Sequence, residues 1–149
     1  MGTELIHKIT KDQPQQAKIE AVSFSGASVM SKYGRFSVAS EDEKYILSIA
    51  DFDVAASNNT DILNNSNGQK FSTYDEDNDK YSGNCAAGWS SRGGWWYDKC
   101  GNFMPNGLWY PESESYRPVE DGWKGMRYGP ITSLRTLKST LMMVKPKDN

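Results

Sequence analysis

The stretch YDEDNDKYSGNC, residues 74–85, carries four carboxylates within six residues and ends at one of the two cysteines of the chain. Asp75, Asp77 and Asp79 alternate with other residues, so in an extended loop their side chains are expected to converge on one side and repel one another. Calcium relieves such repulsion, because it takes about six to eight oxygen ligands from carboxylates, backbone carbonyls and water. The stretch therefore indicates a calcium site, with a solvated acidic turn as the alternative.

The spacing excludes one common calcium site, the EF-hand. Counted from Asp75, the sixth position is Lys80 instead of glycine, and the twelfth is Ala86 instead of glutamate. Gly83 still allows the backbone to curl so that main-chain carbonyls, those of Tyr81 and Gly83, face an ion.

Composition and charge narrow the class of protein. A chain of 149 residues, 37% of them hydrophobic, is expected to form one domain. The net charge is −2 and the 17 basic residues are scattered, so nucleic acid is not an expected partner. No apolar run approaches the roughly 20 residues of a membrane helix. The even cysteine count, Cys85 and Cys100, favours a disulfide in an oxidising compartment over two unpaired buried thiols.

The pattern along the chain predicts an α+β protein dominated by an antiparallel sheet. Residues 17–24, 33–38 and 44–52 are rich in β-branched and aromatic residues, and turn residues separate them. Residues 3–10, with Leu5 and Ile9 four apart, predict a short helix, and residues 137–146 predict a closing strand that ends at proline. Residues 83–129 show little periodicity, which indicates irregular loops held by aromatic packing, a disulfide or a metal, and function is expected there.

Several quoted segments together resemble the fibrinogen C-terminal, or fibrinogen-related, domain. They are NGQKFSTYDEDNDKYSGNCA at 67–86, GGWWYDKC at 93–100, NG at 106–107 and LKSTLMMVKP at 137–146. The resemblance extends over almost the whole chain, but the family's N-terminal subdomain has no counterpart. It implies a single domain over 1–149, with a central sheet subdomain over about 1–70, a loop-rich calcium- and ligand-binding subdomain over about 71–136, and 137–146 returning to the sheet.

The resemblance also implies site residues. The family's calcium ligands match the carboxylates of Asp77 and Asp79 and the carbonyls of Tyr81 and Gly83, with Asp75 behind them. Its disulfide matches Cys85–Cys100, and the peptide bond between Lys99 and Cys100 is expected to be cis.

Lectin members of the family, such as ficolins and tachylectins, bind an acetyl group in an aromatic funnel beside that bond. The matching backbone amides are those of Cys100 and Gly101, and the matching walls are Trp89, Tyr116 and Tyr128. Three departures are Gly101, where such members commonly have histidine, two extra residues between Cys85 and Cys100, and an insertion at 129–136. Five further aromatic residues are expected to pack in the core: Trp95, Trp96, Tyr97, Trp109 and Trp123.

The predicted function is a secreted, calcium-binding lectin-like domain that recognises acetylated glycans in innate immunity. The alternative is a protein- or receptor-binding module, as in angiopoietin-like members. A fibrin-like hole for a peptide ammonium is disfavoured, because the matching positions are Trp89 and Arg117. An enzyme is not expected, since the sole histidine, His7, has no nucleophile and orienting partner. The missing subdomain is expected to expose a sheet edge or face, which favours a homo-oligomer.

Overall fold

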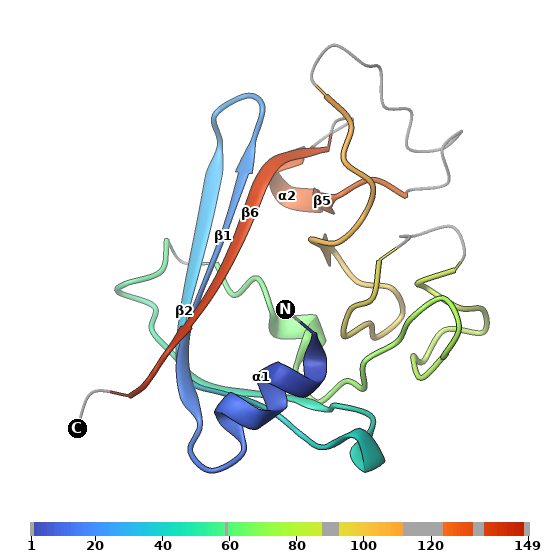
Figure 1. Cartoon of the computed structure of the whole chain (residues 1–149). Coiled ribbons are helices and arrows are strands. Elements are labelled where there is room, and N and C mark those ends of the chain that lie inside the picture. Colours follow the sequence, from blue (N-terminus) through green and yellow to red (C-terminus); the bar gives the residue numbers. More distant parts are fainter. Residues whose placement is uncertain (1, 59, 88–92, 112–123, 133–135, 148–149) are drawn as a thin grey trace.

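The computed structural model describes residues 2–58, 60–87, 93–111, 124–132 and 136–147. Its centre is an antiparallel sheet of four strands in the order β3-β2-β1-β6, with helix α1 near one end and a region of loops beside it (Figure 1). The strands are β1 Gln15–Ser23, β2 Ser28–Val38, β3 Leu47–Phe52 and β6 Leu137–Lys145. The predicted antiparallel sheet is therefore confirmed, and the C-terminal strand lies at its edge beside β1.

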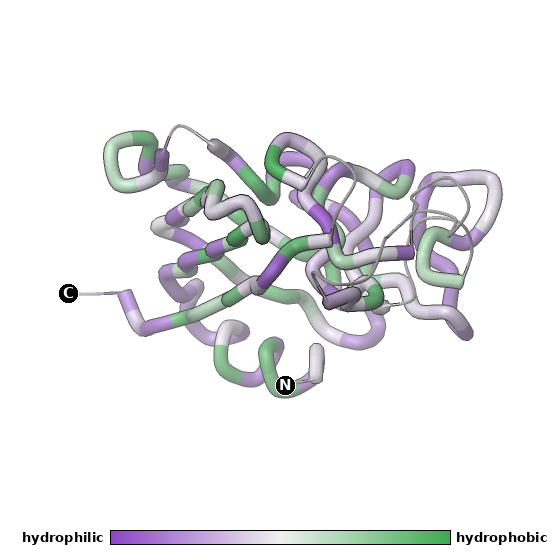
Figure 2. Tube along the Cα trace, turned by 90° about the horizontal axis from the view of Figure 1, so that it is seen from above, coloured by the Kyte–Doolittle hydropathy of each residue, from purple (hydrophilic) through white to green (hydrophobic). Residues whose placement is uncertain are grey.

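Alternation of side chains along the strands creates the buried face. In β1, Ala17, Ile19 and Ala21 are buried, whereas the residues between them are half-buried. Figure 2 shows the same alternation of hydrophobic and hydrophilic residues along the strands. β2 begins earlier than expected because a tight turn joins it to β1, with Gly26 at a φ of +87° that a glycine adopts without steric cost.

Helix α1, Thr3–Thr10, forms where it was predicted. Leu5 and Ile9 are 51% and 42% exposed, and the half-buried Ile6 packs against the core instead. Thr10 connects the helix to the sheet, since its Oγ1 accepts the backbone N–H of Val38 at 3.1 Å. The helix therefore packs on the core through Ile6 and leaves Leu5 and Ile9 exposed.

The loop region beside the sheet contains little regular structure. A two-stranded ladder pairs β4, Phe103–Met104, with β5, Arg127–Tyr128, and the short helix α2, Gly129–Thr132, begins the segment predicted to be inserted. There are two 3₁₀ turns. η1, Glu41–Glu43, lies between β2 and β3, and η2, Asn64–Ser66, follows β3. Within the part of the chain that the structure describes, no helix is long and apolar enough to span a membrane.

Aromatic side chains join the loop region to the sheet. The Trp96 ring meets Phe36 of β2 edge-on at 6.4 Å, and Trp95 meets Phe103 at 5.5 Å. The indole N–H of Trp96 donates to the carbonyl of Tyr45 at 2.7 Å. Trp95, Trp96 and Tyr97 are 4%, 2% and 1% exposed, which confirms their predicted role in packing.

Trp109 corrects the corresponding prediction. Its side chain is 54% exposed, although it was expected in the core. It lies against Phe24 and donates its indole N–H to the carbonyl of Lys138 at 3.2 Å, so one end of β6 holds it at the surface. Trp123 lies outside the described residues.

Candidate ligand-binding site

The acidic loop is organised by Asp79. One carboxylate oxygen of Asp79 accepts the backbone N–H of Tyr81 at 2.9 Å, and the other accepts that of Cys85 at 2.8 Å. Asp77 accepts the N–H of Asp79 at 3.2 Å, so the two carboxylates lie in one turn. Burial raises the pKa of Asp79, and the nearby charge of Asp77 raises it further, while the two N–H donors lower it.

Asp75 does not join that pair, contrary to the expected convergence of three aspartates. Its carboxylate accepts the hydroxyl of Thr73 at 2.6 Å, which satisfies it locally. Glu76 points elsewhere and pairs with Lys44 at 2.7 Å. Among the described residues, no group of three or more histidine, cysteine, aspartate or glutamate side chains is arranged to hold a metal ion.

The carboxylate and carbonyl oxygens of this loop are chemically suited to bind a hard cation. Among the described residues, neither Asp77 nor Asp79 forms an ion pair. In the same part of the chain, no hydrogen-bond donor reaches the main-chain carbonyls of Tyr81 and Gly83. Two carboxylates and two unused carbonyls are oxygen ligands of the kind that calcium takes, with water completing the shell.

The disulfide joins this loop to the next turn. Cys85 and Cys100 are bonded, as predicted, and their Cα atoms are 5.3 Å apart. The peptide bond between Lys99 and Cys100 is trans, so the expected cis bond is wrong. The chain reverses here through two consecutive residues in the left-handed region, Cys100 at a φ of +67° and Gly101 at +84°.

A small polar pocket lies beside that turn, with a volume of about 140 Å³. Its lining combines two carboxylates with amide side chains and the turn itself. The polar lining residues include Asp61, Asp98, Asn64, Asn65 and Asn102, and the turn contributes Cys100 and Gly101. The pocket is therefore suited to a polar or cationic group.

The two carboxylates of the pocket are held in different ways. Asp61 accepts a hydrogen bond from the hydroxyl of Tyr33 through Oδ1 at 2.6 Å. Asp98 forms an ion pair with Lys80, whose Nζ lies 3.1 Å from Oδ1 of Asp98. Burial raises the pKa of Tyr128, which lines the same pocket, and the charge of Asp61 adds to that effect. Within the described chain, no hydrogen bond engages the second oxygen of Asp61 or of Asp98.

The pocket contains some of the residues predicted for ligand binding. Cys100, Gly101 and Tyr128 line it, whereas the exposed Lys99 does not. Tyr128 is only 8% exposed and meets Phe103 edge-on at 6.0 Å. The predicted walls Trp89 and Tyr116 lie outside the described residues, as does Arg117.

Sequence reasoning missed the polar residues of the pocket. Asp98 stands inside the quoted GGWWYDKC segment, two residues before Cys100, so its proximity to the predicted site was a usable signal. Asp61 and the neighbouring asparagines belong to a polar, turn-rich loop that precedes the acidic stretch. The local sequence gives no sign that Asp61 and these asparagines line a site, because only the fold brings their loop close to the disulfide.

Comparison with known proteins identifies the class to which this fold belongs. Residues 1–147 match the family described as fibrinogen beta and gamma chains, C-terminal globular domain, and the chain belongs to that family. It is 33% identical over 150 residues to Angiopoietin-4 of Bos taurus, covering 98% of this chain and 28% of that protein. The chain thus spans less than a third of the length of that relative.

Two solved structures show the same fold. The fibrinogen-like globe domain of human ANGPTL2 matches with a TM-score of 0.83 and 31% identity, over 99% of this chain and 65% of that one. Lamprey fibrin D-dimer, solved with the peptide ligand Gly-His-Arg-Pro-amide, matches with a TM-score of 0.77 and 26% identity, over 99% of this chain and 50% of that one.

Proposed function

We propose that this chain is a secreted, non-enzymatic recognition module that binds a protein ligand or receptor. Its similarity to angiopoietins and to the globe domain of human ANGPTL2 supports this proposal. The resemblance to angiopoietin-like members carries the expectation of receptor binding. The peptide bound by lamprey fibrin D-dimer supports the proposal more generally, since it is a polypeptide ligand of a protein with this fold.

The polar pocket beside the disulfide is the structural observation that carries the proposal. Its carboxylates, Asp61 and Asp98, and its amide side chains suit the charged and hydrogen-bonding groups of a protein surface. A sugar acetyl group requires an apolar wall for its methyl. The described tyrosine of the pocket, Tyr128, has its ring packed in the core against Phe103. The polar groups among the described lining residues support a ligand with charged and hydrogen-bonding groups, such as a protein surface offers.

Calcium is proposed as a structural ligand of the same region. Asp77 and Asp79 would supply carboxylates, and Tyr81 and Gly83 would supply carbonyls. When bound, the ion neutralises the two adjacent carboxylates. Asp79 already accepts the N–H of Cys85, so neutralising this turn would stabilise the segment that enters the disulfide.

Binding of the labelled chain to cultured cells distinguishes the two ligand classes. One set of cells is treated with trypsin, which removes protein receptors, and another with periodate, which oxidises sugars. We expect trypsin to abolish binding and periodate to leave it intact. A glycan array read in calcium and in EDTA provides the second measurement.

Variants locate the binding surface. Asn65→Arg and Asn102→Arg place a bulky cation at exposed positions of the pocket, so we expect them to abolish cell binding without unfolding the chain. Gln13→Arg, an exposed position outside the pocket, is the matched control. Binding that survives trypsin, is lost after periodate and recurs on N-acetylated sugars of the array would replace the protein-ligand proposal with the lectin function.

A further inference from the structure

Two asparagines of the loop after β3 carry the acceptor pattern for N-linked glycosylation. Asn58 stands two residues before Thr60. Asn64 stands two residues before Ser66, and no proline intervenes in either case. Glycans are added to such acceptors in the secretory pathway, so a modification here rests on the secretion proposed above. The pattern treats the two asparagines alike, whereas their surroundings in the fold differ.

The side-chain amide of Asn58 takes the place of a neighbouring strand beside β2. Among the described strands, β3 pairs with β2 only from Tyr33 onward, so the first residues of β2 have no strand on that side. There, Asn58 accepts the N–H of Met30 through Oδ1 at 2.9 Å and donates through Nδ2 to the carbonyl of Ser28 at 3.0 Å. Both polar atoms of the amide are therefore engaged with one strand.

A glycan on Asn58 is incompatible with this pairing. The amide group is planar, and its donor and acceptor reach the same edge of β2, so Nδ2 gives Ser28 the hydrogen on the side of Oδ1. A sugar linked to Nδ2 takes that side, because a substituted amide holds its remaining hydrogen trans to the carbonyl. A chain modified at Asn58 would lose its bond to Ser28, so we expect the folded protein to be unmodified there.

Asn64 has no such role in the fold. Its side chain is exposed, and within the described part of the chain no hydrogen bond engages it. It belongs to the turn η2 and lines the polar pocket together with Asp61 and Gly101. An exposed side chain that also lines a pocket stands at its rim, where an attached glycan extends into solvent.

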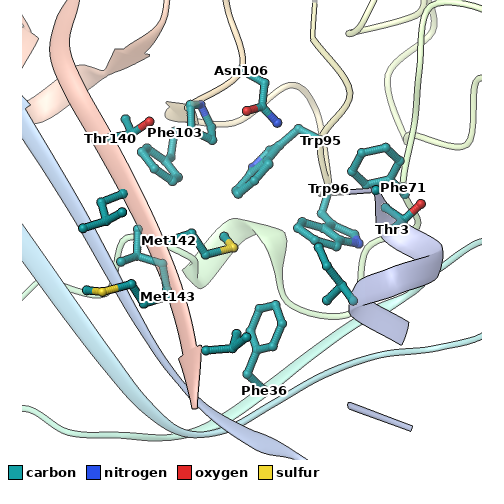
Figure 3. A pocket seen from close by; sticks show the side chains of 16 residues that line it. Thr3, Phe36, Phe71, Trp95, Trp96, Phe103, Asn106, Thr140, Met142 and Met143 are labelled. Carbon is teal, nitrogen blue, oxygen red and sulfur yellow. The ribbon is translucent and has the colours of Figure 1, made fainter. Parts of the chain in front are cut away.

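The second residue of this acceptor indicates when the glycan is added. Ser66 is 5% exposed, and its Oγ accepts the indole N–H of Trp95 at 3.1 Å. Trp95 in turn packs against Trp96 and Phe103 (Figure 3). Because the serine hydroxyl is part of the acceptor pattern, the transferase is expected to act on the unfolded chain, before Trp95 packs.

We propose that Asn64 carries an N-linked glycan, and that this glycan masks the polar pocket so that only the unglycosylated chain binds a protein partner there. A partner of standard size covers about 800 Å² of the chain. A footprint of that size around a pocket of about 140 Å³ includes its rim, where a bulky glycan excludes the partner. The masking rests on the protein-binding role proposed for the pocket, whereas the modification rests only on secretion.

Mass spectrometry of the chain secreted by cultured animal cells, behind an added signal peptide, tests the modification. Trypsin releases residues 45–70 as one peptide, because no lysine or arginine lies between Lys44 and Lys70. The glycosidase PNGase F removes N-linked glycans and leaves aspartate in place of each modified asparagine. We expect aspartate at Asn64, in the treated sample only, and asparagine at Asn58. Asparagine retained at Asn64, or aspartate at Asn58, would overturn the assignment.

Binding to cultured cells tests the masking. The same chain made in the bacterial periplasm, which is oxidising, provides the unglycosylated form, and we expect it to bind cells that the glycosylated chain does not bind. Made in animal cells, Asn64→Gln is expected to regain binding. Asn64→Gln/Lys8→Asn is the matched control, since it moves the acceptor to α1, two residues before Thr10, where the side chain of Lys8 is 63% exposed. It is expected to bind as well as Asn64→Gln.

The two measurements separate the modification from the role of the pocket. Equal binding of the glycosylated and unglycosylated chains would overturn the masking, and so would a failure of either variant to bind. Binding by neither form of the chain would refute the protein-binding role itself and the masking with it. The mass measurement would still decide whether Asn64 is modified.

Discussion

The hydroxyl of Tyr33 on β2 donates to the carboxylate of Asp61 at 2.6 Å and accepts the backbone N–H of Leu63 at 3.1 Å. Tyr33 is 2% exposed and Leu63 is fully buried, so this one hydroxyl satisfies two groups that would otherwise lack a partner. It connects the sheet to the loop that lines the polar pocket. Burial and the hydrogen bond to Asp61 raise the pKa of Tyr33, which keeps the hydroxyl protonated as the donor.

Tyr33→Phe is expected to destabilise the protein by about 2 kcal/mol, because it leaves the buried N–H of Leu63 and an oxygen of Asp61 without a partner. Urea unfolding followed by tryptophan fluorescence measures the change. Tyr74→Phe is the matched control, since Tyr74 is 74% exposed and its loss is expected to change the free energy of unfolding very little. Equal losses in the two variants would contradict the role of the Tyr33 hydroxyl.

Calcium is expected to raise the melting temperature, because an ion that binds only the folded state adds stability. The gain is about 2.7 kcal/mol at a hundredfold excess over the dissociation constant. Melting in calcium and in EDTA measures the gain, which we expect to vanish in Asp77→Ala/Asp79→Ala and to persist in the control Asp12→Ala. A melting temperature that is the same in calcium and EDTA for the unmodified chain would refute the calcium site.

Asp79 is expected to make the metal-free protein less stable as the pH rises. Its pKa in the folded state lies above the ordinary aspartate value, so the folded state holds the proton more tightly than the unfolded state. Its contribution is fully present below the ordinary aspartate pKa and is lost as the pH rises through the raised one. Glu4 and Glu76 act in the opposite direction, since their pKa values are lowered by Lys8 and Lys44.

Comparison with Asp79→Asn isolates that contribution. Melting temperatures of both proteins are measured in EDTA, from below the ordinary aspartate pKa to neutral pH. The unmodified chain is expected to have its largest advantage in melting temperature over Asp79→Asn at the acidic end. This advantage should shrink or reverse as the pH rises. Calcium is expected to reduce this dependence in the unmodified chain. Parallel pH curves for the two proteins in EDTA would show that Asp79 does not titrate differently on folding.

The disulfide is expected to contribute about 3 kcal/mol through the closed loop between Cys85 and Cys100, whose sequence separation is 15. Unfolding of Cys85→Ala/Cys100→Ala measures the loss. We also expect this variant to bind cells less well, because the turn at Cys100 and Gly101 lines the polar pocket. Unchanged stability and unchanged binding would show that the disulfide organises neither the fold nor the pocket.

Patterns that depend on neighbouring residues were predictable. The alternation in β1 and β3 follows from the geometry of a strand, so the antiparallel sheet was expected from composition and spacing. The pairing of Cys85 with Cys100 follows once a chain with two cysteines forms a disulfide within itself. The acidic spacing and the quoted segments also indicated the family, which the match over residues 1–147 confirms.

Features that depend on distant residues were decided only by the tertiary structure. The helix face at Ile6 was selected by the sheet, and the surface position of Trp109 by its contact with β6. Asp61 reaches the pocket because the buried Tyr33, 28 residues earlier in the chain, holds it there. Local spacing determines which side chains share a strand face, whereas burial and long-range hydrogen bonds determine which of them meet, and these exist only once the chain has packed.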